Sequence, residues 1–164
     1  MSENIKIAVD AMGGENSPKK IIEGILRNHK ENSEVLYNIF GDLEKIEPFL
    51  PKNYNKKIFN IVNTKNKILD TDSPLSAAKK GKDTSMWLTI QSVKNNESDV
   101  AISAGNTGAL FVISKLNLQM IKNIDKPALS ALWPNKKNFN IVLDLGLNIE
   151  CNEKNLIDFS IMGS

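Results

Sequence analysis

The sequence predicts an α/β fold of three layers, in which a mainly parallel, Rossmann-like sheet is covered by helices on both faces. Short segments rich in isoleucine and valine, typical of strands buried on both faces, alternate with segments whose apolar residues have helical spacing. This alternation is characteristic of parallel sheets. The chain has 164 residues, of which 41% are hydrophobic, and this is enough to form the core of one domain.

The first half of the chain is expected to contain three strands separated by helices. Pro18 suits the first turn of the first helix, with Ser17 as a candidate N-cap. That helix carries one apolar stripe, formed by Ile22, Ile25, Leu26 and His29. The strands are Ile5–Asp10, Val35–Phe40 and Ile58–Val62, and a short helix after Gly41-Asp42 ends near Pro51.

The second half continues the alternation. A helical region opens at Ser73-Pro74, is broken at Gly81 and resumes over Thr84 to Val93. From Gly108 to Met120 the apolar residues again have helical spacing. The expected strands are Asp99–Ser103, Leu129–Trp133 and Asn140–Leu145, and the last helix contains Leu156, Phe159, Ile161 and Met162.

Charge and composition exclude several classes of protein. The formal net charge is +2 and the basic residues are spread along the chain, which argues against a nucleic-acid partner. Arg27 is the single arginine among 21 basic residues. Contacts to a phosphate group must therefore come from lysines, backbone amides or hydroxyls.

A cytoplasmic location is expected from the same composition. Cys151 is the only cysteine, so no disulfide can form within the chain, and this suits a reducing compartment. Residues 1–20 contain no continuous apolar segment of the kind found in signal peptides. No segment approaches the roughly 18–20 apolar residues needed to span a bilayer.

Three polar segments that contain glycine each follow an expected strand. They are DAMGGEN (Asp10–Asn16), SAGNTGA (Ser103–Ala109) and DLGLN (Asp144–Asn148). In doubly wound folds, ligands bind at the carboxyl ends of the strands. We therefore expect the three segments to meet at one edge of the sheet.

The segment SAGNTG permits two interpretations. Gly105 and Gly108 leave successive N–H groups uncovered where a helix begins, which favours an anion site, and Ser103, Asn106 and Thr107 offer side-chain hydrogen bonds. The alternative is a tight turn between strand and helix, capped by Asn106 or Thr107. The segment matches neither the dinucleotide-binding glycine pattern nor the Walker phosphate loop.

The other polar segments are equally ambiguous. Asp10, Gly13, Gly14 and Asn16 either bind a ligand or form a turn with a cap, and Asp144, Gly146 and Asn148 repeat this choice. No histidine accompanies these acids and amides, so they do not form a metal-binding set. In KKGKDTSM, Lys82, Thr84 and Ser85 suit a phosphate group, whereas a solvated turn capped by Asp83 is the alternative.

Covalent catalysis by the protein is disfavoured. His29 lies on the apolar stripe of a helix, Cys151 is interpreted as an unreactive thiol, and Trp87 and Trp133 are interpreted as packing residues. The residues present suit a reaction in which the substrate is the nucleophile. Inorganic phosphate attacking an activated thioester would need mainly positioning and stabilisation of the developing oxyanion.

Four motifs occur in a fixed order: AVDAMGGENSP (Ala8–Pro18), KDTSM (Lys82–Met86), AISAGNTGAL (Ala101–Leu110) and DLGLNIEC (Asp144–Cys151). Together they resemble the bacterial phosphate acyltransferases of phospholipid synthesis. PALSALWP (Pro127–Pro134) and the closing FSIMGS also resemble that family, so the resemblance covers essentially the whole chain. Members of the family are about twice as long. Residues 1–164 are therefore expected to be the amino-terminal part of a phosphate acyltransferase domain that is truncated relative to the family.

The sequence departs from the family pattern at a few positions. Glu15 stands where the family usually has Asp, and Leu147 stands where it has a smaller residue. Gly81 and Thr84 interrupt a stretch that is more often basic-basic-Asp-Ser-Ser. These departures concern substrate preference more than the reaction.

The resemblance implies a fold like that of the isocitrate and isopropylmalate dehydrogenases and of phosphotransacetylase. It implies transfer of an acyl group from acyl carrier protein to inorganic phosphate, giving acyl phosphate for phospholipid synthesis, without metal or organic cofactor. It also implies a homodimer, a loose association with the membrane surface, and hand-off to a membrane glycerol-3-phosphate acyltransferase.

The motifs carry two sets of expected site residues. Those expected to act in catalysis are Asp10, Lys82, Asn106, Asp144 and Asn148. Those expected to bind phosphate or substrate are Gly13, Gly14, Asn16, Ser85, Ser103, Gly105, Thr107, Gly108 and Gly146.

Two other functions are kept as alternatives. One is a dehydrogenase-like relative of the same fold that uses a nicotinamide cofactor and a divalent metal held by aspartates. The other is an inactive half-length fragment that only binds ligand or dimerises.

Overall fold

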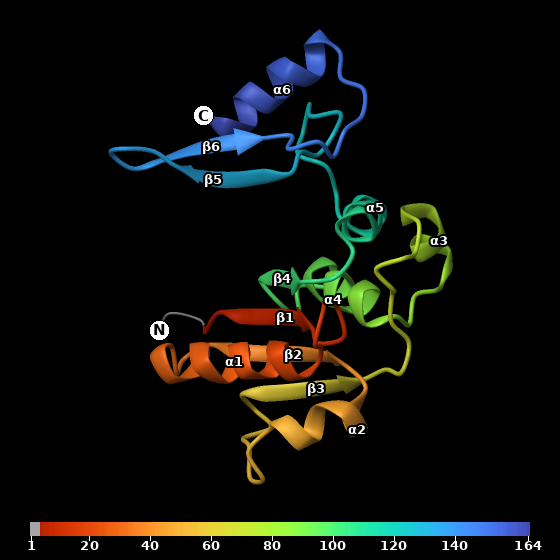
Figure 1. Ribbon diagram of the computed structural model, residues 1–164, viewed down its shortest axis with the longest axis vertical. Coiled ribbons are helices and arrows are strands. Elements are labelled where there is room, and N and C mark those ends of the chain that lie inside the picture. The colour runs from red at the N-terminus through yellow and green to blue at the C-terminus, as the bar shows by residue number, and fades with distance from the viewer. Residues whose placement is uncertain (1–3) are drawn as a thin grey trace. The chain divides into compact units, whose positions relative to one another are not determined.

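The computed structural model describes residues 4–164, and the chain divides into two compact units, Met1–Leu118 and Gln119–Ser164. The first unit contains a four-stranded parallel sheet in the order β3-β2-β1-β4 (Figure 1). The predicted α/β fold with a mainly parallel sheet is thereby confirmed. The strands are β1 (Lys6–Asp10), β2 (Leu36–Gly41), β3 (Phe59–Asn63) and β4 (Val100–Ser103).

One face of this sheet is covered by α1 (Lys19–Glu31). Ile22 and Ile25 of α1 are buried in one core with side chains of the first three strands, and half-buried His29 packs edge-on against Phe59 at 5.0 Å between ring centroids. The predicted position of His29 on the apolar stripe of this helix is therefore confirmed. Between β2 and β3 the chain forms α2 (Leu43–Ile46) and the short 3-10 helix η1 (Glu47–Phe49).

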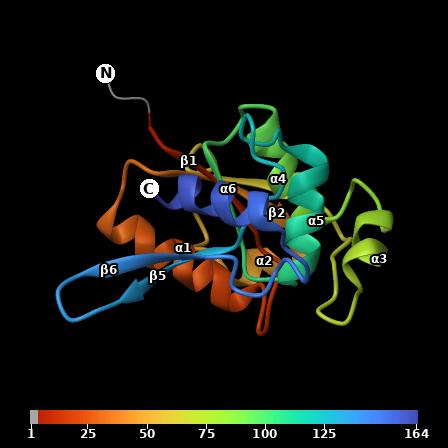
Figure 2. The same cartoon turned by 90° about the horizontal axis from the view of Figure 1, so that it is seen from above.

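The opposite face is covered by α4 (Ser85–Lys94), which packs against β1, β2 and β4. Successive side chains of a strand point to opposite faces, so Ala8 and Phe40, which are buried but do not belong to the core under α1, lie on this second face. A second core joins α4 to α3 (Pro74–Lys79) and α5 (Thr107–Asn117). Helix α3 lies beside α5, as Figures 1 and 2 show.

Some helix ends differ from the expected ones. Ser17 does not cap α1, because its hydroxyl donates to the carbonyl of Met12 at 2.9 Å and the N-cap position is taken by Pro18. Helix α4 is capped by Thr84 rather than Asp83. Helix α5 ends at Asn117, before the expected Met120, because Leu118 has extended backbone angles.

The second unit consists of the strands β5 (Ser130–Pro134) and β6 (Phe139–Leu143) and the helix α6 (Glu153–Gly163). The two strands pair antiparallel in a separate sheet, so they are not part of the parallel sheet that the alternation predicts. Only residues 135–138 connect them, and a parallel pair would need a crossover of about a dozen residues. Asn135 closes the turn by accepting the amides of Lys137 and Asn138.

Over residues 4–164, none of the helices combines the length and the apolar character that crossing a bilayer requires.

Candidate functional site

Two loops rich in glycine meet at the carboxyl edge of the parallel sheet. Strands β1 and β4 are neighbours in register, with Asp10 opposite Ser103, so the loops that follow them leave the sheet side by side. The Ser103 hydroxyl donates to Asp10 Oδ2 at 2.7 Å, and the Gly105 amide donates to Ser103 Oγ at 3.2 Å. Asp10 is buried and also accepts the Met12 amide. The Asp10 carboxylate thus links the starts of both loops.

The backbones of the two loops are in direct contact. A Cβ added at Gly13 would lie 2.8 Å from the Gly105 nitrogen, and one added at Gly14 would lie 2.6 Å from the Ala104 carbonyl oxygen. Gly14 also has a φ of +83°, which favours glycine. The glycines of DAMGG therefore allow this loop to lie against SAG without any side chain between them.

Helix α5 begins at the second loop, and Asn106 is its N-cap. Asn106 Oδ1 accepts the Ala109 amide at 3.0 Å, as the capping alternative predicts. The first amides of a helix have no partner within the helix. Within residues 4–164 the Asn106 side chain accepts the Ala109 amide alone, so the amides of Thr107 and Gly108 are left to point out of the helix end.

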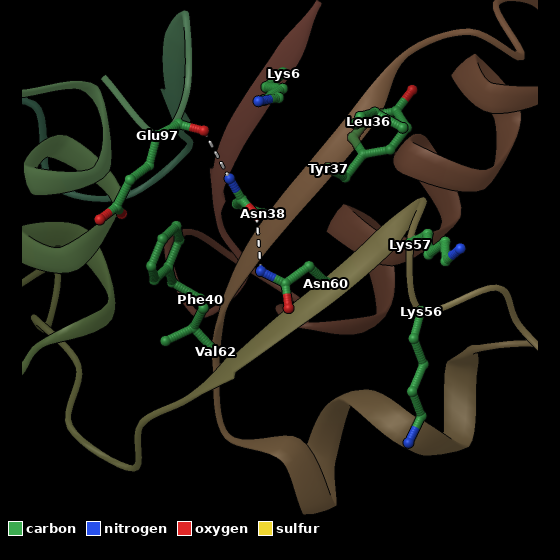
Figure 3. A pocket seen from close by; sticks show the side chains of 10 residues that line it. All are labelled: Lys6, Leu36, Tyr37, Asn38, Phe40, Lys56, Lys57, Asn60, Val62 and Glu97. Atoms are coloured by element: carbon green, nitrogen blue, oxygen red, sulfur yellow. Dashed lines mark hydrogen bonds between the residues drawn. The ribbon is translucent and has the colours of Figure 1, made fainter. Parts of the chain in front are cut away.

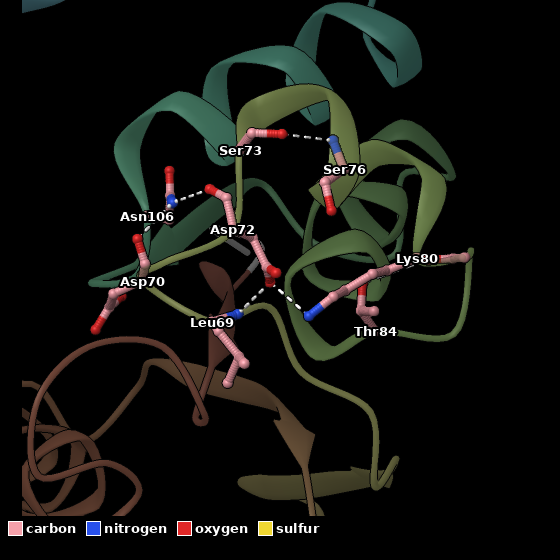
Figure 4. A network of polar contacts seen from close by, with 9 residues as sticks. Leu69, Asp70, Asp72, Ser73, Ser76, Lys80, Thr84 and Asn106 are labelled. Carbon is pink, nitrogen blue, oxygen red and sulfur yellow. Dashed lines mark hydrogen bonds and ion pairs between the residues drawn. The ribbon is translucent and has the colours of Figure 1, made fainter.

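The structure assigns Asn106 and Gly108 contacts within the protein. Asn106 Nδ2 donates to the carbonyl oxygens of Asp70 and Asp72, at 3.1 and 2.9 Å (Figure 4). Both the amide oxygen and the amide nitrogen of Asn106 are thus engaged. A Cβ at Gly108 would lie 2.7 Å from Pro74 Cγ, so this glycine allows α3 to pack on the start of α5.

The start of α4 lies beside the same loops. The Met86 methyl group would be 3.0 Å from a Cβ at Gly105, and the buried Ser85 hydroxyl makes no hydrogen bond within the part of the chain that the structure describes. Lys82 lies on the exposed turn before α4, and Asn16 is exposed after the first loop with a φ of 59°. The assigned roles of Lys82 and Asn16 stay predictions.

The third polar segment belongs to the second unit. It follows β6 of the antiparallel pair, so the expectation that all three segments follow strands of one sheet is wrong. Asp144 Oδ1 accepts both the backbone and side-chain amides of Asn148, which also donates to the Pro127 carbonyl. Asp144 and Asn148 therefore orient one another, and Gly146, with a φ of +79°, completes the turn.

The Cys151 thiol donates to Asp144 Oδ2 at 3.3 Å. Loss of solvation raises the pKa of Cys151, and the hydrogen bond to the Asp144 carboxylate raises it further. Loss of solvation also opposes ionisation of Asp144, but the hydrogen bonds from Asn148 and Cys151 outweigh it and hold the pKa of Asp144 below its ordinary value. A thiol that stays protonated agrees with the interpretation of Cys151 as unreactive.

Sequence reasoning did not identify Asp70, Asp72 and Lys80, which contact the start of α5 directly or through one another. The available signal was the acidic residue immediately before Ser73-Pro74, a helix start, with a lysine one helix length later. The hydrogen bonds that join Asp70 and Asp72 to Asn106 span 36 and 34 residues of sequence, so no local pattern reveals them.

A hollow of about 540 Å³ lies over one face of β2 and β3, and Phe40 and Val62, near the ends of these strands, also line it (Figure 3). Lys6 and Leu36, the first residues of β1 and β2, are part of its lining. The Asn60 side chain donates to Asn38, which in turn donates to the Glu97 carbonyl, so both side-chain amides in the hollow already have partners within the protein. Ligands of doubly wound folds bind at the carboxyl ends of strands, so the glycine loops are the better candidate site.

Over residues 4–164, no group of three or more His, Cys, Asp and Glu side chains is arranged to hold a metal ion.

Comparison with known proteins gives a consistent result. Residues 5–164 match the family model described as "Fatty acid synthesis protein". The phosphate acyltransferase of Pelagibacter ubique is 67% identical over 164 residues, which are 100% of this chain and 49% of that protein. Those of Paramagnetospirillum magneticum and Rhodospirillum rubrum are 37% identical over 99% of this chain and 47% of their own length. These matches confirm the resemblance to the phosphate acyltransferases, and the chain spans about half the length of the curated relatives it matches.

Proposed function

The chain belongs to the fatty acid synthesis protein family, and on this premise we propose that it forms the phosphate-binding part of a phosphate acyltransferase. The enzyme would transfer an acyl group from acyl carrier protein to inorganic phosphate, and the acyl phosphate would supply phospholipid synthesis. Relatives in three organisms bear the name phosphate acyltransferase, which supports this reaction rather than a dehydrogenase.

The observation that carries the proposal is the meeting of two glycine loops beside a helix start. Gly13 and Gly105 are in backbone contact, and the Thr107 and Gly108 amides point out of the helix end that follows. A phosphate dianion would lie on these amides, where the helix dipole adds roughly half a positive charge. The Ser103 hydroxyl borders this position, and Lys82 is proposed as a mobile charge partner.

Asp10 is best suited to a positioning role. Its carboxylate accepts hydrogen bonds from Ser103 and from the Met12 amide, and these offset its negative charge beside the anion. By accepting the hydrogen bond from the Ser103 hydroxyl, Asp10 turns an oxygen lone pair of Ser103 toward the Gly105 amide. Asp10 would thereby keep the two loops together rather than transfer a proton.

The reaction needs little covalent participation from the protein. An oxygen of phosphate attacks the thioester carbonyl carbon, a C–O bond forms, the C–S bond breaks, and the released thiolate takes a proton from water. Phosphate is already anionic at neutral pH. The contribution of the chain is to hold phosphate in position and to stabilise the oxyanion with backbone amides.

Further features of the family are part of the proposal. They are a fold of the isocitrate and isopropylmalate dehydrogenase type, a homodimer, and a peripheral association with the membrane for hand-off of acyl phosphate to a glycerol-3-phosphate acyltransferase. Asp144 and Asn148 of the second unit would help to shape the substrate site through the closed turn that they form.

The test compares the 164-residue chain with the same chain extended by the remaining half of the Pelagibacter ubique relative. Each is mixed with an acyl-carrier-protein thioester and phosphate, and acyl phosphate is trapped with hydroxylamine. We expect the extended protein to form acyl phosphate, and a failure to detect acyl phosphate would refute the proposal. Phosphate binding without turnover by the 164-residue chain would identify that chain as a binding fragment.

A further inference from the structure

We propose that Asp72 and Lys80 are positioning residues for the phosphate site, because they fix the start of α5 through the side chain of Asn106. The proposal rests on the proposed function, since it assumes that the Thr107 and Gly108 amides bind phosphate. Neither Asp72 nor Lys80 belongs to the glycine loops. Their effect on phosphate would pass through hydrogen bonds alone.

The first step is the closure of a turn over residues 69–72. Asp72 Oδ2 accepts Lys80 Nζ at 2.6 Å and the Leu69 amide at 2.7 Å (Figure 4). The Asp72 amide donates back to the Leu69 carbonyl at 3.1 Å. The Asp72 side chain is only 12% exposed, so this ion pair is partly shielded from water. The carboxylate therefore holds both ends of the turn and ties it to α3.

The second step connects this turn to α5. The turn presents the carbonyl oxygens of Asp70 and Asp72 in one direction, and both accept Asn106 Nδ2. With both N–H groups donated, the amide plane of Asn106 has one orientation. In that orientation Asn106 Oδ1 accepts the Ala109 amide and sets the first turn of α5.

A separate contact holds the same helix end. Pro74, the first residue of α3, packs on Gly108, where even a methyl group would not fit. The start of α5 is thus fixed by packing at Gly108 and by hydrogen bonds at Asn106. Removing the ion pair leaves the packing in place, so the helix would stay folded while its first amides shift.

Charge supports this arrangement. The hydrogen bond from Lys80 and that from the Leu69 amide hold the pKa of Asp72 below its ordinary value, although loss of solvation opposes them. Asp72 is therefore ionised at neutral pH, and the turn is closed under those conditions.

The experiment is a titration of the 164-residue chain with inorganic phosphate, followed by NMR at the Thr107 and Gly108 amides. We expect Asp72→Asn and Lys80→Met to weaken phosphate binding about tenfold, which corresponds to about 1.4 kcal/mol. Lys80→Arg should restore binding to near the wild-type value, because it keeps the charge and the hydrogen bond. Thermal unfolding of each variant tests whether the fold is retained.

Lys79→Met is the matched control. Lys79 is exposed on the same helix, and no ion pair involves it within residues 4–164. The control removes the same charge without touching Asp72. If Lys79→Met weakens binding as much as Lys80→Met, general electrostatics explains the effect and the proposal is overturned.

The remaining outcomes separate this proposal from the proposed function. If phosphate shifts the Thr107 and Gly108 amide signals of the wild type, and Asp72→Asn binds phosphate with the same affinity as the wild type, the positioning role is overturned. If phosphate does not shift the wild-type amides, the proposed phosphate site fails. In that case the side-chain NH₂ signals of Asn106 decide the positioning role: they must move in Asp72→Asn, and unchanged signals overturn it.

Discussion

Replacing Gly13 with alanine tests the contact on which the candidate site depends. The added Cβ would lie 2.7 Å from Asp10 Oδ2, 2.8 Å from the Gly105 nitrogen and 3.0 Å from Ser103 Oγ. Ordinary contacts of this kind are 3.4–4 Å. The Gly105 nitrogen is backbone, so the two loops must separate by about 0.6 Å rather than adjust a side chain.

The expected cost follows from this overlap. Overpacking in a close-packed region destabilises by about 1–3 kcal/mol. At roughly 4 °C per kcal/mol for a unit of this size, Gly13→Ala should lower the unfolding temperature by about 4–12 °C. Since Gly13 is not among the residues of the described chain with positive φ, backbone strain adds nothing to this cost.

Gly24→Ala is the control for Gly13→Ala. Gly24 lies on the exposed side of α1, and an added Cβ meets nothing within 4 Å. Alanine is favoured over glycine within a helix by about 0.5–1 kcal/mol, so this variant should be more stable than the wild type. Both variants add one methyl group, and only the space around it differs.

The measurement is urea and thermal unfolding by circular dichroism, together with a phosphate titration of the Thr107 and Gly108 amides. We expect Gly13→Ala to lose stability and to bind phosphate about tenfold more weakly, because the loops that border the anion have moved. Equal unfolding temperatures for Gly13→Ala and Gly24→Ala would refute the reasoning from close backbone contact.

Three further predictions concern other parts of the chain. Thr84→Ala removes the N-cap of α4, since Thr84 Oγ1 accepts the Trp87 amide, and the free energy of unfolding measured with urea should fall by about 1 kcal/mol. Asp144→Asn should speed alkylation of Cys151 by a few fold near pH 8, because the carboxylate that helps to raise the thiol pKa is removed; an unchanged rate would contradict this. The hydrogen bond from Lys154 lowers the pKa of Asp158 in the folded chain below its ordinary value of 3.8. The pair therefore stabilises α6 fully above pH 3.8, and the stabilisation is lost as the pH falls through the lowered pKa of the folded state. The protection factors of the α6 amides, which correct the exchange rates for their intrinsic pH dependence, should therefore fall in acid, and Lys154→Met should reduce that pH dependence.

The sequence alone predicted the elements around the candidate site. Alternation of apolar residues and turn residues is local, so the four parallel strands and the loops after β1 and β4 were found at nearly their observed bounds. Asn106 was one of the two caps, with Thr107, that the turn interpretation offered, because capping depends on residues only three apart. The antiparallel pair of β5 and β6 was missed, although the four residues between them are too few for a parallel crossover.

The tertiary structure decided which of these segments meet. Strand order is set by packing over the whole sheet, and it brings Asp10 beside Ser103 across 93 positions of sequence. The same packing seals Gly13 against Gly105 and closes the turn of Asp72 onto Asn106. A sequence pattern records which residues favour a turn or a cap, because those preferences depend on near neighbours. The contacts that make glycine necessary at one position and engage an asparagine at another depend on distant segments, and only the folded chain supplies them.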